Sequence, residues 1–162
     1  MNFFQRHHAN KQIKTNIAEA DNILRLMQKC IVPANNIYWC NNMFLMEGDD
    51  DEINFQQLKS QTPAFISYAK QLRNLFLATE KLTVEYPEMV INVVNEFSRR
   101  LQVLDDQLST LIADIKELKI YDKVPLLQQT VKVLKLYLKT IIENNKIISD
   151  YKYADCDFEH TN

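Results

Sequence analysis

The chain has 162 residues, of which 46% are apolar and 25% charged, and its net charge of −2 gives no reason to expect binding to nucleic acid. Gly48 is the only glycine, which excludes phosphate-binding loops, dinucleotide-binding turns and nucleophile elbows, because all of these need glycine where the backbone approaches a ligand. No stretch has the 18 or more uninterrupted apolar residues expected of a membrane span. The composition therefore favours long helices and disfavours most enzymes.

The first predicted helix carries apolar residues at heptad spacing from Ile13 to Ile31. We expect Pro33 to end it, because proline lacks a backbone N–H and disfavours helix in the residue before it. Residues 33–52 then mix asparagines with bulky apolar residues, including the only tryptophan, Trp39. This predicts an apolar loop, with at most a short helix, that is buried either on the helices or on a partner.

An acidic run at 49–52 precedes the second predicted helical segment, 53–82. We interpret the run as a helix start, because carboxylates are favourable there and no calcium-loop pattern follows. Pro63 interrupts the heptad spacing of the segment. Two interpretations remain open: Thr62 caps a new helix with Pro63 in its first turn, or one helix kinks near 61–63.

The third segment has the clearest pattern. Pro87 and Glu88 suit a first helical turn, and apolar residues then follow at unbroken heptad spacing to Leu118. We expect a helix over 87–119, about 33 residues and roughly 50 Å long. A strict 3.5-residue repeat of this length predicts left-handed coiled-coil packing.

The fourth segment begins near Asp122, with Pro125 in its first turn. We expect a helix over 124–152, antiparallel to the third because the link between them is short. Asn145 is the one polar residue at its heptad positions. It either selects register and partner or is a solvated residue near the helix end.

The segments together predict an all-α fold, an elongated helical hairpin or coiled-coil bundle of about four helices. We divide the chain into an N-terminal helix and apolar loop (1–52), a helical coiled-coil core (53–153) and a flexible polar tail (154–162). The apolar seam either forms the internal core or binds partner helices. The residues predicted to bind partners are Val94, Phe97, Leu101, Leu104, Leu108, Leu111, Ile115, Leu134, Leu138, Ile141 and Asn145.

Candidate catalytic and metal-binding residues are scattered. His7 and His8, with Cys30 and Cys40, match no zinc-ligand spacing and form no recognisable nucleophile pair. We therefore predict no cofactor, no metal site and no enzymatic activity. Three irregularly spaced cysteines are not a disulfide framework, which favours an intracellular, reducing location.

Two stretches carry a family resemblance. The first is 53–62, followed at similar spacing by Glu85, Tyr86, Val93, Phe97, Leu101, Gln107 and Leu111, and the second is 142–151. These stretches resemble the α-helical region of the nucleoporin fifty-eight/forty-five family of the nuclear-pore channel, over residues 53–153. The resemblance implies a coiled coil with the other two channel nucleoporins. The chain has none of the Phe-Gly repeats with which that family binds transport receptors.

We therefore expect a scaffold or assembly subunit that binds partner helices by coiled-coil packing. The resemblance implies a location at the nuclear envelope and a role in protein transport. The alternative is a helical-bundle adaptor of a trafficking, cytoskeletal or kinetochore complex, in the cytoplasm or nucleus.

Overall fold

The computed structural model describes the backbone of residues 3–43, 48–83 and 85–161, and the side chains of 3–43, 50–83 and 85–151. The described residues form helices and short links, with no strand among them, so the predicted all-α class is confirmed. The elements are α1 (Phe3–Asn42), α2 (Gly48–Ser60), α3 (Thr62–Lys81), α4 (Pro87–Lys116), the short 3-10 helix η1 (Tyr121–Lys123) and α5 (Pro125–Thr161).

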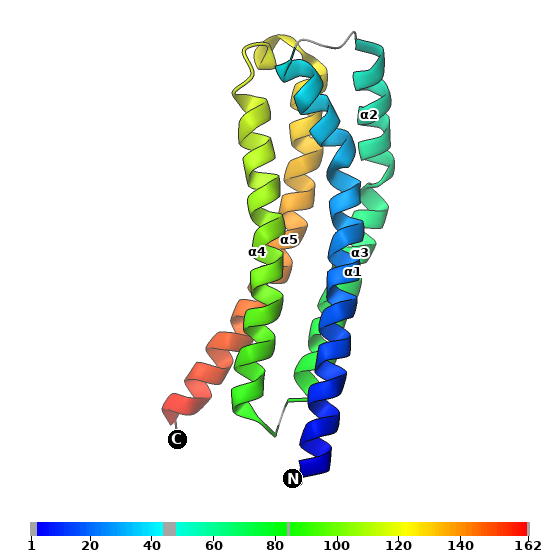
Figure 1. Cartoon of the computed structure of the whole chain (residues 1–162). Coiled ribbons are helices and arrows are strands. Elements are labelled where there is room, and N and C mark those ends of the chain that lie inside the picture. Colours follow the sequence, from blue (N-terminus) through cyan, green and yellow to red (C-terminus); the bar gives the residue numbers. More distant parts are fainter. Residues whose placement is uncertain (1–2, 44–47, 84, 162) are drawn as a thin grey trace.

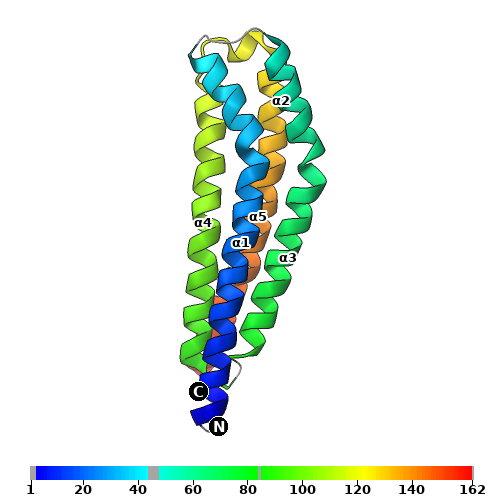
Figure 2. The same ribbon diagram turned by 45° about the vertical axis from the view of Figure 1, so that its right-hand side comes forward.

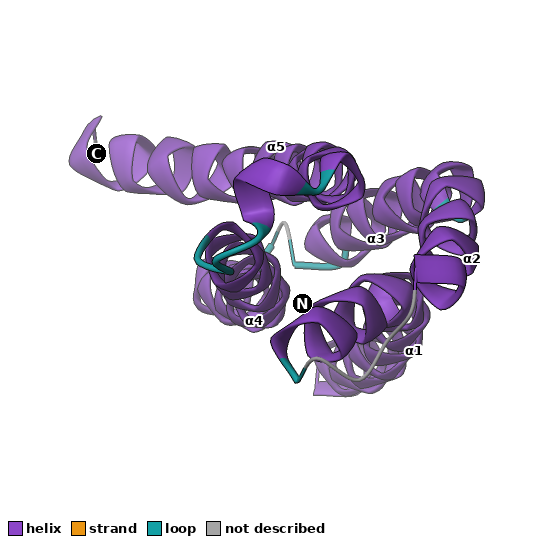
Figure 3. Ribbon diagram, turned by 90° about the horizontal axis from the view of Figure 1, so that it is seen from above, coloured by secondary structure: helices purple, strands orange, loops and turns teal. Residues whose placement is uncertain are grey.

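Helices α2 and α3 follow each other as one bent rod, so the elongated bundle has four rods (Figure 1). Consecutive rods are antiparallel, as the short links predict. The hairpin of α1 with α2 and α3 packs beside the hairpin of α4 with α5, and Figure 2 shows α1 running lengthwise between α4 and α3. Seen from above, α1 lies next to α4, and α3 lies next to α5 (Figure 3). These two neighbouring pairs therefore run parallel.

Our prediction that Pro33 ends the first helix is wrong, because α1 continues through Pro33 to Asn42. Proline inside a helix costs about 3 kcal/mol. However, Ile31 and Ile37, on either side of it, are at most 4% exposed, and burying a side chain of this size contributes roughly 1.5–3 kcal/mol. Pro33 is itself buried, so packing against the bundle outweighs the missing hydrogen bond.

The predicted apolar loop at 33–52 is wrong for 33–42 and 48–52, which are helical, while 44–47 lie outside the described residues. Helix α2 begins at Gly48, so the acidic run does lie at a helix start. The domain boundary that we placed after residue 52 consequently falls inside α2.

The bend between α2 and α3 agrees with the kink interpretation. Gln61 alone separates the helices, and its backbone is helical (φ −88°, ψ −4°). Its N–H donates to the Gln57 carbonyl (3.1 Å), and its carbonyl accepts from the Phe65 N–H (2.9 Å), so helical hydrogen bonding continues through it. The Thr62 hydroxyl donates to the Leu58 carbonyl (3.4 Å) instead of capping a new helix. The buried Tyr137 hydroxyl of α5 donates to the same carbonyl (2.8 Å) and so ties the kink to the opposite hairpin.

Helix α5 starts at Pro125, after the extended residue Val124, whereas Asp122 lies in η1. It is longer than the predicted 124–152, because its backbone is helical to Thr161. The boundary that we placed at 153 therefore falls inside α5. Figure 1 shows this last part of the helix leaving the side of the bundle.

Candidate protein-binding groove

The predicted partner-binding residues lie within the chain's own bundle. Those that are buried are Val94, Phe97, Leu101, Leu104, Leu108, Leu111 and Ile115 on α4 and Leu134 and Ile141 on α5. Leu138 and Asn145 are half-buried. A partner helix could reach the buried set only by displacing a helix of the bundle, and partner binding there remains a prediction.

The buried face of α5 differs from the predicted one at two positions, and at each the buried residue is the one before the predicted residue. Tyr137 is fully buried and Asn144 is 6% exposed, whereas the predicted Leu138 and Asn145 are only half-buried. The Asn144 amide donates to the Ala69 carbonyl of α3 (2.9 Å). The buried polar residue that links helices is therefore Asn144, because the side of α5 that carries it packs against α3.

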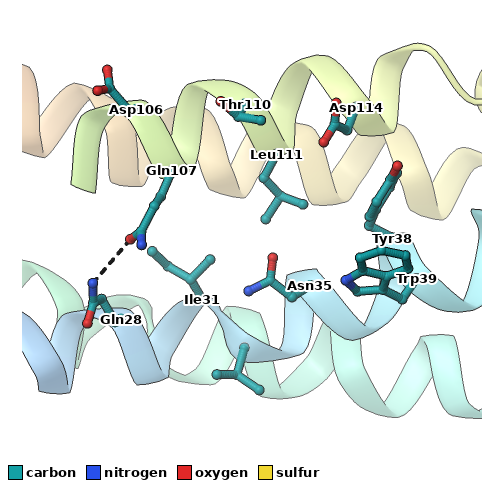
Figure 4. Close-up of a pocket in the computed structure, with 11 residues that line it drawn as sticks. Gln28, Ile31, Asn35, Tyr38, Trp39, Asp106, Gln107, Thr110, Leu111 and Asp114 are labelled. Carbon is teal, nitrogen blue, oxygen red and sulfur yellow. Dashed lines mark hydrogen bonds between the residues drawn. The ribbon is translucent and has the colours of Figure 1, made fainter. Parts of the chain in front are cut away.

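The upper half of the α1–α4 contact opens into a groove of about 650 Å³ (Figure 4). Its floor contains Ile31 of α1 and Leu111 of α4, both at most 6% exposed. The remaining lining residues are Gln28, Val32, Asn35, Tyr38 and Trp39 from α1 and Asp106, Gln107, Thr110 and Asp114 from α4. The two helices thus supply an apolar floor between polar and aromatic walls.

The α1 wall presents apolar side chains to solvent. Trp39 is 56% exposed and Val32 is 47% exposed. Tyr38 is half-buried and contacts Trp39 edge to face, with ring centroids 5.5 Å apart. Trp39 belongs to this wall because α1 continues as a helix through Pro33, which places Ile37 against the bundle and leaves Trp39 exposed to solvent.

The charges along the groove are of one sign. Between Lys29 and its end at Asn42, α1 has no charged residue. Between Arg100 and Lys116, α4 has aspartates but no lysine or arginine. Two of these aspartates, Asp106 and Asp114, line the groove. Because α1 and α4 are parallel, the partially negative carboxyl ends of both helices also lie at this end of the bundle.

Below the groove, polar side chains of α1 and α4 bridge the two helices. At the lower boundary of the groove, the Gln28 amide donates to Gln107 (3.3 Å), as Figure 4 shows. Further down, Arg100 donates to Asp21 (2.6 Å), and an exposed ion pair joins the ends of the two helices. The groove is therefore bounded at one end by side chains that bridge the helices.

The cysteines and histidines do not build a site. Burial raises the pKa of the Cys30 thiol, and burial, followed by Asp51 and Asp50, raises the pKa of Cys40. Both directions disfavour a reactive thiolate. In the part of the chain that the structure describes, no three His, Cys, Asp or Glu side chains gather as a metal site. Its described helices also include none with the length and apolar character to cross a membrane.

No family model matches the chain, and comparisons with curated proteins and with solved structures give no significant match. The groove was not predicted from the sequence. Two features of the sequence could have indicated it. One is the charge-free stretch of α1 around Trp39, and the other is the part of α4 whose only charged residues are aspartates.

Proposed function

We propose that the chain is a non-enzymatic assembly subunit that binds a helix of a protein partner in the α1–α4 groove. The observation that carries the proposal is the exposed pair Trp39 and Val32 beside the apolar floor of Ile31 and Leu111. Tryptophan and tyrosine are enriched among the residues that dominate interface energies, and grouped exposed apolar side chains mark interaction sites.

The shape of the site supports a helix-in-groove mode of binding. Residues 28–39 of α1 extend for about 16 Å, which is about three turns of a partner helix. Both walls are helices packed into the bundle, so the groove is preformed and little conformational entropy is lost on binding.

The resemblance over 53–153 makes the nuclear-pore channel the specific assembly that we propose, with an adaptor role in a trafficking, cytoskeletal or kinetochore complex as the alternative. The proteins that co-purify with the chain distinguish these assignments. Channel nucleoporins are expected in the first case and subunits of another complex in the second.

The test of the groove compares two variants that remove similar apolar surface. Val32→Ser with Trp39→Ser alters the groove wall. Leu136→Ser with Ile142→Ser alters α5, where these residues are 43% and 50% exposed. We expect the groove variant to lose at least about 90% of the co-purified partner and the α5 variant to retain it. Circular dichroism and thermal melts check that both variants fold.

Two outcomes would contradict the proposal. Retention of every partner by the folded groove variant would remove the groove as the binding site. Loss of partners only in the α5 variant would place the site on α5 instead.

A further inference from the structure

The charge along the groove indicates the chemistry of its occupant. We infer that the groove binds a basic, amphipathic helix, which places a large apolar side chain on the floor of Ile31 and Leu111 and lysine or arginine side chains against Asp106 and Asp114. This inference rests on the proposed function and adds the class of partner.

The carboxylates of the groove have acceptor capacity to spare. Asp106 accepts one hydrogen bond, from the Gln102 amide (2.9 Å), and neither it nor Asp114 forms an ion pair within the described side chains. An ionised carboxylate can accept about four hydrogen bonds. Asp114 lies across from Asn35 (Figure 4), and residues 30–42 of α1 carry no charge, so a cationic partner would supply donors that this part of α1 lacks.

A second groove, between α3 and α5, has the opposite charge balance. Lys70, Arg73 and Lys139 line it together with one acidic residue, Glu143. A basic helix would be repelled there and attracted to the α1–α4 groove, because like charges across an interface are unfavourable. The charge balance therefore favours the α1–α4 groove as the site for a basic helix.

The fold also favours a helix over an extended peptide. The structure has no strand in the ranges it describes, so an extended segment would find no sheet edge for its backbone hydrogen bonds. A helix satisfies its own backbone groups and needs only side-chain contacts with the groove.

The experiment uses two synthetic amphipathic helices of about 18 residues, which is five turns. One has leucines on one face and lysines on the other, and in the second glutamates replace the lysines. Fluorescence anisotropy of the labelled peptide gives Kd. The emission of Trp39, the only tryptophan of the chain, reports whether the peptide contacts the groove.

We expect the lysine peptide to bind and to shift the Trp39 emission. Asp106→Lys with Asp114→Lys should weaken its binding at least about tenfold and strengthen binding of the glutamate peptide, because each substitution replaces an attraction by a repulsion. Glu19→Lys with Asp150→Lys is the control, because it changes the net charge equally at exposed positions outside the groove. This control variant should retain the preference for the lysine peptide over the glutamate peptide and the shift of the Trp39 emission.

Three results would overturn the inference. Equal affinity for both peptides would indicate a groove without charge selection. Failure of both peptides to bind, with partners still lost from the Val32 and Trp39 variant, would leave the proposed function and refute the basic helix. Groove-dependent self-association of the chain, measured by light scattering, would identify a second copy as the occupant.

Discussion

The lower and upper halves of the α1–α4 contact are built from the same two parallel helices and differ in how their charges are paired. In the lower half, Arg100 of α4 donates to Asp21 of α1 and to Glu96 of its own helix. In the upper half, Asp106 and Asp114 line the groove, and Asp114 lies across from Asn35, in a stretch of α1 that has no charged residue. The comparison teaches that the closed half joins its two helices through an ion pair, whereas the open half leaves carboxylates available to an external donor.

The two halves also differ in the side chains that cover the apolar interior. Leu104, in the lower half of α4, is 1% exposed, whereas Leu111, two turns further along, forms the floor of the groove and is 6% exposed. The same residue type therefore lies under packed side chains in one half and under an open groove in the other.

The largest expected effect compares these two leucines. Leu104→Ala should lower the free energy of unfolding by about 3–4 kcal/mol, because it leaves a closed cavity. Leu111→Ala should cost about 2 kcal/mol, because the space it leaves opens into the groove and water can enter. Urea denaturation with a constant m-value measures both.

Equal losses for the two variants would contradict this view of the groove floor, since they would show that the two sites are equally closed. Circular dichroism of each variant in the absence of urea controls for a change in helix content.

The rods themselves could be predicted because helix periodicity is a local property. The heptad spacing from Val94 to Ile115 and the short link after it led to α4 and its antiparallel packing against α5. Pro33 misled the prediction because the contacts that offset its cost come from residues far away in the sequence. The same limit affected α5. The heptad spacing of Leu134 and Ile141 is compatible with burial of either Tyr137 and Asn144 or Leu138 and Asn145, and only contacts with other helices decide between them.

The groove could not be predicted because it depends on how α1 and α4 lie relative to each other. The sequence marks Trp39 as unusual and places aspartates at 106 and 114, but it does not show that these residues line one groove. That arrangement arises from the packing of two hairpins side by side, which no spacing along the chain encodes.

The next effect tests the charges of the closed half through pH. Hydrogen bonds from Arg100, and then from Arg99, lower the pKa of Glu96. A carboxyl group whose pKa is lower in the folded state than in the unfolded state stabilises the fold at a pH above its unfolded-state pKa, which is near 4.3 for glutamate. This stabilisation is lost as the pH falls through the folded-state pKa. We expect the stability measured by urea denaturation to decrease below about pH 4, and Arg100→Met to reduce this decrease.

Asp106→Asn is the matched control in the open half, because Asp106 has no cationic partner in the described structure. It should leave the acid dependence as it is in the parent chain. A slope that is the same with and without Arg100 would show that the closed half does not depend on this pairing.

The smallest expected change in stability comes from giving the open half an internal cation. Asn35 of α1 is exposed and lines the groove across from Asp114 (Figure 4), so Asn35→Arg would place a guanidinium near a carboxylate that has no partner cation in the described structure. An exposed ion pair contributes only about 0.2–1 kcal/mol, and the thermal midpoint should rise by a few degrees at most. Binding of the lysine peptide should weaken much more, because the new arginine occupies its acceptors and repels its charge. Asn35→Gln, a neutral side chain, should retain binding. If the arginine variant bound the peptide as tightly as the glutamine variant, the unpaired carboxylates would not be what distinguishes the open half from the closed one.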